Sequence, residues 1–528
     1  MTGHDPWKRI DVASFGYMWS LAQEQSSYFN LQLAGVTPEF KAYLPYWLGA
    51  WSIQATQGWL APEVAVRLPF SLMSLASMTF LWYAIYHLAR NPRAQPVAFA
   101  FGGEAQPKDY ARSLADAGLL AYMACLGLAL PSHETTPMAM QLFGTAIFFA
   151  GASAMAYFPQ RALVVWFGGL LVMTMSGAPS MALILGMGSC FLWFKHPQAQ
   201  LQQVGLMLLT LFSLLGLVVS LDLWTWQILP TAELTQHWRE KAELLMWFLW
   251  PAWPLAAWTL WRWRGHWRTQ LWSQHLILPL FVFIVTLMGS LTTRAPEKTL
   301  LLALPSLAAL AAFALPTLSR SVAALIDWFT LLFFTGCALM ILGVWISLQT
   351  GVPAQPALNV ARLVPGYVHN FDVLSFSVAV LVSVVWLKLV QWRIGRHPTV
   401  IWKSLVLPAS GATLCWVLLM TLWLPILDRA LSYRPWSTQL VALMNYPSCV
   451  YADGLERNQL AGLSYHGQFV FIDFHSKLDG QPCDWLMTRK SSQLLSMSNE
   501  IQGWQMVRRS KRPADRNEEI LIFKRVGP

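Results

Sequence analysis

The chain has 528 residues, of which 55% are hydrophobic and only 12% are charged, with 29 tryptophans and 28 phenylalanines. A soluble domain carries about twice that share of charge, so the composition excludes an ordinary soluble protein and predicts a polytopic α-helical membrane protein. The formal net charge of +10 falls largely in short loops between apolar runs, so it reflects membrane topology, and we expect no nucleic-acid partner.

Residues 1–63 precede the apolar runs. Apolar residues recur at helical spacing, with scattered polar ones, at 10–23 and 44–59. This pattern predicts two amphipathic helices that lie in the membrane interface without crossing it. A polar loop that contains Glu39 and Lys41 joins them, and nothing in the segment has the features of a signal peptide.

About twelve apolar runs follow, each long enough, or nearly so, to cross about 30 Å of hydrocarbon. They lie near 64–89, 116–131, 137–157, 161–176, 180–194, 204–226, 243–262, 275–293, 299–317, 322–348, 371–392 and 401–426. Every second loop is basic, most clearly 90–113, 261–268 and 393–403, which predicts that these loops are cytoplasmic. An even number of spans then places both ends of the chain outside, in the periplasm of a Gram-negative cell.

The tail after the last apolar run changes character. Strand-like runs occur at 448–452, 469–474 and 483–490, a short helix is expected at 457–466, and two further strands are expected to form a hairpin, at 504–510 and 519–525. The sequence therefore predicts three parts: an external segment 1–63, a membrane domain 64–426 and a small α/β domain 427–528.

The cysteines divide between these parts. Four lie inside apolar runs, where a cysteine behaves as a small buried hydrophobe; they are Cys125, Cys190, Cys337 and Cys415. Cys449 and Cys483 are the two in the tail, and each stands at the start of a strand-like run. An external tail lies in an oxidising compartment, so we expect these two to form a disulfide.

Three stretches resemble a known family. They are GHDPWKRIDVASFG (3–16), LPYWLGAWSIQ (44–54) followed by VAVRLPFSL (64–72), and RAPEKTLLLALPSLAAL (294–310). In this order, over essentially the whole chain, they resemble the GT-C glycosyltransferases that take a sugar from a polyprenyl-phosphate donor, and more specifically bacterial protein-mannosyltransferase and lipid A aminoarabinose transferase relatives. The resemblance implies an enzyme of the bacterial inner membrane that transfers a sugar to a lipid, glycan or protein acceptor on the periplasmic side.

The chain departs from that family at its acidic motifs. Where relatives have an Asp-Glu pair in the first external loop, this chain has Ile10 and Asp11. Relatives have one more transmembrane helix ahead of this loop, so we expect that the chain begins at a late methionine or has lost that helix.

Two further family motifs are also altered. Relatives have Glu-Lys-Pro-Pro before the second interfacial helix; here Lys41 is retained and Glu39 stands one residue out of register. The family's second aspartate matches Met138, which leaves Glu134 as the nearest acid.

Sugar transfer from a lipid phosphate needs a base for the acceptor and positive charge at the departing phosphate. The resemblance makes Asp11 the candidate base and Lys41 a candidate phosphate contact. Arg294 and Lys298, at an external helix end, are further candidates for the phosphate, and a divalent metal ion is a possible cofactor. Glu39, Glu134 and His237 are candidate contacts for a metal or an acceptor.

Each of these residues also has a structural interpretation. A juxtamembrane acid such as Asp11 often caps a helix or is solvated, and a lysine such as Lys41 often anchors the chain at lipid headgroups. His237 could be an ordinary interfacial histidine, and Arg294 and Lys298 could be interfacial anchors.

Two functions therefore remain open. The chain is either an active transferase or a catalytically silent GT-C-like subunit that binds lipid or a paralogous partner, and an intact paralogue encoded next to it would favour the second. A transporter is disfavoured, because the spans show no pair of ionisable residues near their middle and no inverted repeat.

Overall fold

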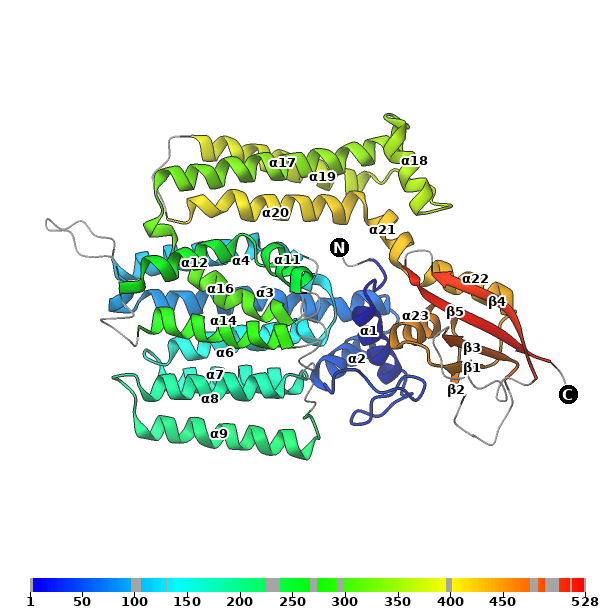
Figure 1. Cartoon of the computed structure of the whole chain (residues 1–528), viewed down its shortest axis with the longest axis horizontal. Helices are drawn as coiled ribbons and strands as arrows, with labels where there is room; N and C mark the ends of the chain where they lie inside the picture. The colour runs from blue at the N-terminus through cyan, green and yellow to red at the C-terminus, as the bar shows by residue number, and fades with distance from the viewer. Residues whose placement is uncertain are drawn as a thin grey trace.

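The computed structural model describes residues 3–95, 106–129, 131–224, 238–265, 273–292, 299–395, 401–474, 483–489, 503–512 and 515–526. Most of these residues are helical, and a five-stranded sheet lies near the C-terminus. Figure 1 shows the long helices side by side, with the sheet and the helices around it gathered at one end of the bundle.

The two amphipathic helices expected before the membrane domain are present. They are α1 (Arg9–Ala22) and α2 (Leu44–Ala55). Gly49 lets them approach, because a Cβ at this position would lie 2.4 Å from the sulfur of Met18. On its other side α1 meets the small domain, where a Cβ at Gly16 would lie 2.4 Å from that of Ala461. Helix α1 is therefore packed between α2 and the small domain.

The membrane domain follows, and its elements occur in the predicted order. They are α3 (Pro62–Ala89), η1 (Pro92–Ala94), α4 (Pro107–Ala124), α5 (Leu126–Ala129), η2 (Pro131–His133), α6 (Pro137–Ala154), α7 (Pro159–Met175), α8 (Pro179–Phe194), α9 (Leu201–Ser220), α11 (Trp238–Phe248), α12 (Ala252–Arg262), α14 (Gln274–Thr292), η3 (Leu301–Ala303), α16 (Leu304–Ala312), η4 (Leu315–Thr317), α17 (Arg320–Thr350), α18 (Ala354–Leu363), α19 (Val373–Ile394) and α20 (Lys403–Leu422). Helices α3, α4, α6, α7 and α8 all begin at a proline, whose fixed φ suits the first turn.

Seven helices in the described ranges are long and apolar enough to cross a membrane; they are α3, α6, α9, α14, α17, α19 and α20. Helices α7 and α8 and the stretch 301–317 are apolar but shorter. The predicted runs 116–131 and 243–262 coincide with α4–α5 and α11–α12. The chain is thus an integral membrane protein, and the count of about twelve spans stays a prediction.

Helix α6 forms the centre of the bundle. Most of its residues are buried, and its glycines allow close contact with α7. A Cβ at Gly151 would lie 2.4 Å from the backbone nitrogen of Trp166, and one at Gly169 would lie 2.3 Å from that of Phe148. Small residues at such crossings let helix backbones approach in a membrane.

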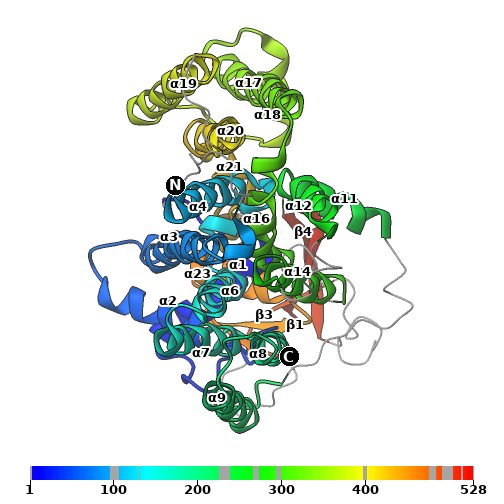
Figure 2. The same ribbon diagram turned by 90° about the vertical axis from the view of Figure 1, so that its left-hand side faces the viewer.

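Helices α17, α19 and α20 form a separate layer beside this bundle, as Figures 1 and 2 show. The layer contains an ion pair that the sequence analysis did not find. Arg393, at the end of α19, forms an ion pair with Asp327 of α17, and both side chains are largely buried. The pair lies toward the ends of both helices, so it does not form a mid-span ion pathway.

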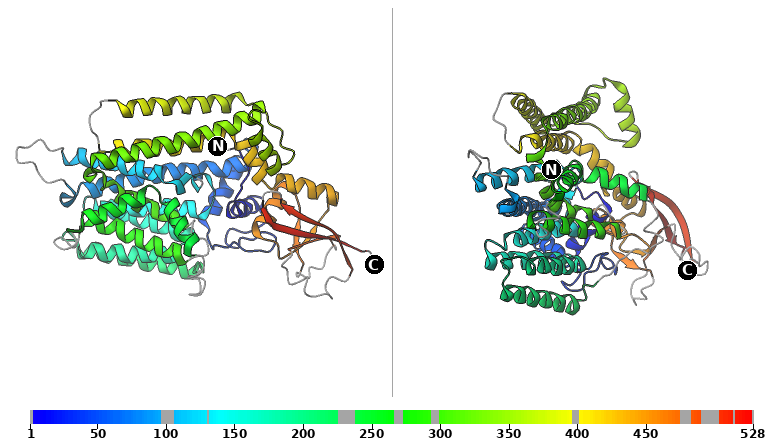
Figure 3. Two further views of the ribbon diagram at one scale, coloured as in Figure 1. Left: turned by 45° about the horizontal axis from the view of Figure 1, so that its top comes forward. Right: turned by 60° about the vertical axis from the view of Figure 1, so that its left-hand side comes forward.

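The small domain begins earlier than its strands, with two helices that the sequence analysis did not predict, α21 (Leu424–Leu431) and α22 (Arg434–Met444). The predicted elements then follow: β1 (Val450–Asp453), α23 (Arg457–Gly467), β2 (Phe471–Asp473), β3 (Trp485–Arg489), β4 (Trp504–Arg512) and β5 (Asp515–Arg525). The strand order is β2-β1-β3-β5-β4; β1 is parallel to β2 and β3, and β4 and β5 form the expected antiparallel hairpin, visible in Figure 3.

A buried carboxylate joins the small domain to α1. Glu518 of β5 accepts hydrogen bonds from the hydroxyl of Tyr433 (2.7 Å), the amide of Asn458 (2.9 Å) and the guanidinium of Arg512 (3.0 Å). Arg9, the first residue of α1, lies 3.4 Å from the same carboxylate. The start of α1 is thus fixed to the sheet by charge as well as by apolar contact.

The basic loops predict a specific topology for this arrangement. Figure 1 places the C-terminal ends of α3, α8 and α19 at the end of the bundle opposite the sheet. We expect a cysteine introduced at Gly265 to react with a membrane-impermeant thiol reagent only after the cells are permeabilised, and one at the exposed Tyr446 to react in cells whose inner membrane is intact. Labelling of both positions from the same side would contradict the topology.

The tail cysteines generate a second prediction. Cys449 and Cys483 are joined in the structure, with their Cα atoms 5.4 Å apart, a usual separation for a disulfide. Closing this loop should stabilise the small domain by about 3–4 kcal/mol. Mass spectrometry of the unreduced protein should find the two peptides linked. Free thiols at both positions in oxidised protein would refute the prediction.

Candidate active site

Polar side chains gather where the start of the chain, the first turn of α3, the turn before α6 and the small domain meet. We call this group the buried polar cluster. Its members are His4, Asp5, Asp11, Glu63, Arg67, His133, Asp428, Arg434 and His466. All but Arg434 are largely removed from solvent. Buried charges need partners, so the contacts within the cluster decide what each member can do.

Arg67 is the cation at the centre of the cluster. It lies two turns into α3 and is only 2% exposed. Its guanidinium donates hydrogen bonds to the backbone carbonyls of His4 and Asp5. Four carboxylates act on its charge; they belong to Asp11, Glu63, Asp428 and Asp5. Arg67 therefore fixes the path of the N-terminal segment and neutralises acids from separate parts of the chain.

Asp11, the candidate base, lies in the first turn of α1 and is 3% exposed. One of its carboxylate oxygens accepts two hydrogen bonds from Thr135, from the backbone N–H at 2.7 Å and from the hydroxyl at 2.9 Å. Thr135 stands two residues before α6. In this state Asp11 links α1 to the start of α6, and it is neither solvated nor the cap of α1, the two structural roles considered from the sequence.

Asp5 has more contacts than Asp11. Its carboxylate accepts hydrogen bonds from the hydroxyl of Ser432 and from the guanidinium of Arg434 (3.0 Å). Its backbone N–H donates to the carboxylate of Asp428 (2.9 Å), which also accepts from the indole N–H of Trp7 (2.9 Å). Burial raises the pKa of Asp428. Residues at the two ends of the chain thus form one hydrogen-bonded unit.

The small domain supplies the outer part of the cluster. Arg434, at the start of α22, has an exposed side chain that lies between Asp5 and Glu63, 3.8 Å from the latter. His466 of α23 lies 3.6 Å from Asp5, and burial lowers its pKa. Arg434 is therefore the cation of the cluster that solvent, or a ligand, can reach.

Two histidines complete the cluster on the membrane side. The ring of His4 lies 4.0 Å from that of Trp7 and 5.4 Å from that of His133, which also packs on Trp416 of α20 at 5.1 Å. Burial, and then the charge of Arg67, lower the pKa of His4 to about 3. Burial lowers the pKa of His133 to about 4. Both rings are neutral near pH 7.

The other predicted site residues do not join this cluster. The ammonium group of Lys41 pairs with Asp222, just after α9. Glu39 is exposed. Burial raises the pKa of Tyr17 and Tyr46, and the negative charge of Glu39 adds to this effect. Within the described ranges no hydrogen bond or ion pair connects Lys41 or Glu39 to Asp11. Their proposed roles remain predictions.

Glu134 is buried next to Thr135, in the turn that contacts Asp11. His237, Arg294 and Lys298 lie outside the described residues. In the described part of the chain no group of three or more histidine, cysteine or acidic side chains has the geometry of a metal site. The residues described do not by themselves fit a divalent ion, and we derive no step through one.

An apolar groove lies in the side of the bundle. It has a volume of about 370 Å³ and lies between α12, α17 and α20. Ala124 and Trp250 line one of its ends, and the backbone N–H of Leu126 donates to the carbonyl of Trp250 (3.1 Å). Helix α5 begins at Leu126, and η2, which ends at His133, follows it. The lining residues from α17 and α20 belong to the first half of each helix, toward the end of the bundle opposite the sheet, so most of the groove lies away from the cluster.

Sequence reasoning missed Asp5, Glu63, Arg67, Asp428, Arg434 and His466. Asp5 and Arg67 both lie within the stretches that resemble the family, GHDPWK and VAVRLPFSL. A signal was thus present for these two residues, because each lies close to a proline in a string that resembles the family. No local pattern marks Asp428 or Arg434, because their contacts are with residues more than 400 positions away.

Comparison with solved structures returns ArnT from Cupriavidus metallidurans in two states. The chain matches ArnT in the apo state with a TM-score of 0.61 and 14% identity, over 99% of this chain and 95% of that one. It matches ArnT bound to undecaprenyl phosphate with a TM-score of 0.57 and 14% identity, over 98% and 94%. No family model and no curated protein sequence matches the chain. The chain has the fold of ArnT over nearly its full length, which confirms the fold that the resemblance in sequence predicted.

The histidines of the cluster predict a loss of stability in acid. The pKa of a histidine in the unfolded chain is about 6.5, whereas burial lowers the pKa of His133 in the folded chain to about 4. The unfolded state therefore binds more protons between these values, and stability falls as the pH falls from about 6.5 toward 4. At pH 5 one such histidine lowers the free energy of unfolding by about 2 kcal/mol relative to neutral pH.

His133→Phe keeps an aromatic ring against Trp416 and removes the titration. We expect it to reduce the drop in unfolding midpoint between pH 7.5 and pH 5, measured in detergent. The matched variant His369→Asn, at an exposed position, should leave the drop unchanged. An identical pH dependence in wild type and His133→Phe would contradict the account.

Proposed function

We propose that this chain is a membrane glycosyltransferase that moves a sugar from a polyprenyl-phosphate donor to a lipid, glycan or protein acceptor on the periplasmic side of the bacterial inner membrane. Residues 1–63 would form its external interfacial segment, 64–426 the membrane domain and 427–528 a periplasmic domain. The fold shared with ArnT, which has been crystallised with undecaprenyl phosphate, makes this substrate class the first to test.

The observation that carries the proposal is that the bundle has an apolar groove between α12, α17 and α20 and a cluster of buried carboxylates at its sheet end. A polyprenyl phosphate has the same two parts, a long apolar chain and an anionic head. The groove between α12, α17 and α20 would hold the chain, and the phosphate would lie at the membrane surface near Arg434, whose side chain is exposed.

The reaction then has a defined course in this site. Asp11 would accept the proton of the acceptor hydroxyl, whose oxygen forms a bond to the anomeric carbon of the sugar. The bond between that carbon and the phosphate oxygen breaks, and its electron pair leaves with the phosphate. Arg434 would stabilise the charge that develops there. Thr135 contacts one Asp11 oxygen in the present state, so the other carboxylate oxygen would accept the proton.

Lys41, Arg294 and Lys298 remain proposed contacts for the phosphate. Lys41 would have to exchange its partner Asp222 for the phosphate, which is feasible because both side chains are exposed. Glu39, Glu134 and His237 stay as proposed contacts for an acceptor or for a divalent ion.

The alternative is a catalytically silent subunit that binds lipid or a GT-C paralogue. One observation favours it: the acids of the cluster have internal partners, with Asp11 on Thr135 and Asp5 on Ser432 and Arg434. A cluster built only to join α1, α3 and the small domain would look the same. The two functions therefore differ in turnover, not in fold.

Turnover by the purified chain with a polyprenyl-phosphate sugar tests the proposal. Asp11→Asn keeps the size of the side chain and should lower turnover by about a hundredfold or more. The protein should still fold and bind polyprenyl phosphate. The control Glu24→Gln replaces an exposed acid just after α1 by its amide, and its turnover should stay near that of the wild type.

Two results would contradict the enzyme. Turnover that survives Asp11→Asn would remove Asp11 as the base. Absence of turnover in the wild type, with a range of lipid-phosphate sugars and with binding of polyprenyl phosphate retained, would favour the silent subunit.

A further inference from the structure

A second polar cavity lies at the end of the bundle opposite the small domain. We call it the distal cavity. It has a volume of about 670 Å³ and is formed by the end of α3 with η1, the start of α4, the turn after α6 and the turn between α8 and α9. Its functional groups include Arg90, Arg93, Lys108, Tyr157, His196 and Gln198. The lining that the structure describes thus contains three cations and no carboxylate.

Aromatic rings hold one of these cations without neutralising it. The guanidinium of Arg90 lies 4.7 Å from the centre of the Tyr157 ring and 5.5 Å from that of Tyr86. Such cation–π contacts fix the position of a charge but leave it available to an anion. Arg93 and Lys108 are exposed at the rim.

Helix α4 adds a further feature that favours an anion. It has 18 residues and starts at the cavity with Gln106 and Pro107. The Gln106 side chain makes no capping hydrogen bond. The positive end of the helix dipole therefore faces the cavity together with the three cations.

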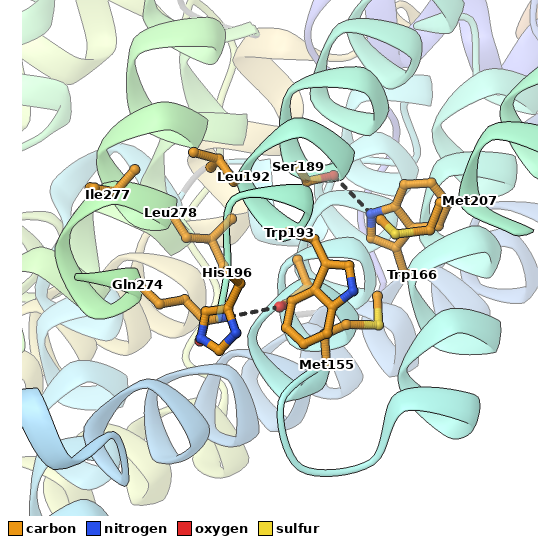
Figure 4. A pocket seen from close by; sticks show the side chains of 11 residues that line it. Met155, Trp166, Ser189, Leu192, Trp193, His196, Met207, Gln274, Ile277 and Leu278 are labelled. Atoms are coloured by element: carbon orange, nitrogen blue, oxygen red, sulfur yellow. Dashed lines mark hydrogen bonds between the residues drawn. The ribbon is translucent and has the colours of Figure 1, made fainter. Parts of the chain in front are cut away.

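The wall behind the cavity is rigid. His196 stacks on Trp193 with ring centres 4.9 Å apart, and the indole N–H of Trp193 donates to Gln203 (3.1 Å). Burial, and then Arg93, lower the pKa of His196, so the ring offers a hydrogen bond and not a charge. Figure 4 shows His196 beside Trp193 and Gln274, around a separate inner cavity of about 30 Å³. This inner space has room for little more than a water molecule or two, so a larger ligand must lie in the distal cavity.

We propose that the distal cavity binds the phosphate headgroup of an anionic phospholipid from the leaflet on its side of the membrane. The cavity lies at the helix ends, at the level where headgroups lie. Phe158 follows Tyr157 in the lining turn and is 48% exposed, which provides an apolar surface for the upper part of an acyl chain. The site would anchor this end of the bundle and is independent of the proposed transferase reaction.

The test measures lipid binding to the full chain, delipidated in detergent, by native mass spectrometry. Dioleoyl phosphatidylglycerol is the probe, and dioleoyl phosphatidylcholine is the uncharged comparison. The double variant Arg93→Glu/Lys108→Glu reverses two exposed charges at the rim. We expect its highest-affinity phosphatidylglycerol site to weaken at least tenfold. Arg320→Glu, an exposed charge reversal at the start of α17, is the matched control and should bind like the wild type.

Three outcomes would overturn the proposal. They are undiminished phosphatidylglycerol binding by the double variant, equal binding of phosphatidylcholine by the wild type, and displacement of the lipid by millimolar inorganic phosphate, which would assign the cavity to a soluble anion. If the double variant does not fold, the single variants Arg93→Gln and Lys108→Gln decide the matter. Each should weaken binding, and unchanged binding in both would equally refute the site.

Discussion

The structure at the sheet end of the bundle depends on one buried cation. Arg67 is almost inaccessible to solvent and is surrounded by the charges of four acids from the N-terminal segment, α1, α3 and α21. Removing one partner of a buried ion pair typically costs about 3–5 kcal/mol, because the remaining charge has lost its compensation. Here a single guanidinium compensates several carboxylates and also holds two backbone carbonyls. The N-terminal segment can follow its observed path only while that charge is present.

This constraint explains how the soluble part is attached to the membrane part. Asp5, placed by Arg67, contacts Ser432 and Arg434 of the small domain, and Arg9 contacts Glu518 of the sheet. Helix α1 lies between these polar links with its apolar face against α23. The small domain is therefore joined to the bundle through the N-terminal segment as well as through the covalent connection after α20. Any movement that opens the cluster to a substrate must act on these contacts.

Much of this fold could be predicted from the sequence, because membrane spans, amphipathic helices and strands each have a local periodicity. The runs from 64–89 to 401–426 all coincide with helices, and the strands of the tail lie where alternation predicted them. Helices α21 and α22 were missed because 427–447 was assigned to the tail by its composition alone.

The candidate site was predictable only in part. Asp11 lies in the buried cluster, but the partners that define its chemistry, Thr135 and Arg67, come from distant parts of the chain. Lys41 looked like a phosphate contact from its place in a motif, and its ion pair with Asp222 depends on how α9 ends, which no local pattern reveals. Which charged side chains pair with each other depends on the tertiary fold, and the pairing cannot be inferred from local patterns in a single sequence.

The most direct measurement for the central claim is a structure of the chain determined in lipid nanodiscs with undecaprenyl phosphate. The account predicts the phosphate in contact with Arg434 at the edge of the buried polar cluster and the isoprenoid chain in the groove between α12, α17 and α20. A lipid phosphate bound away from Arg434, or a groove filled by side chains while the lipid lies elsewhere, would contradict the account.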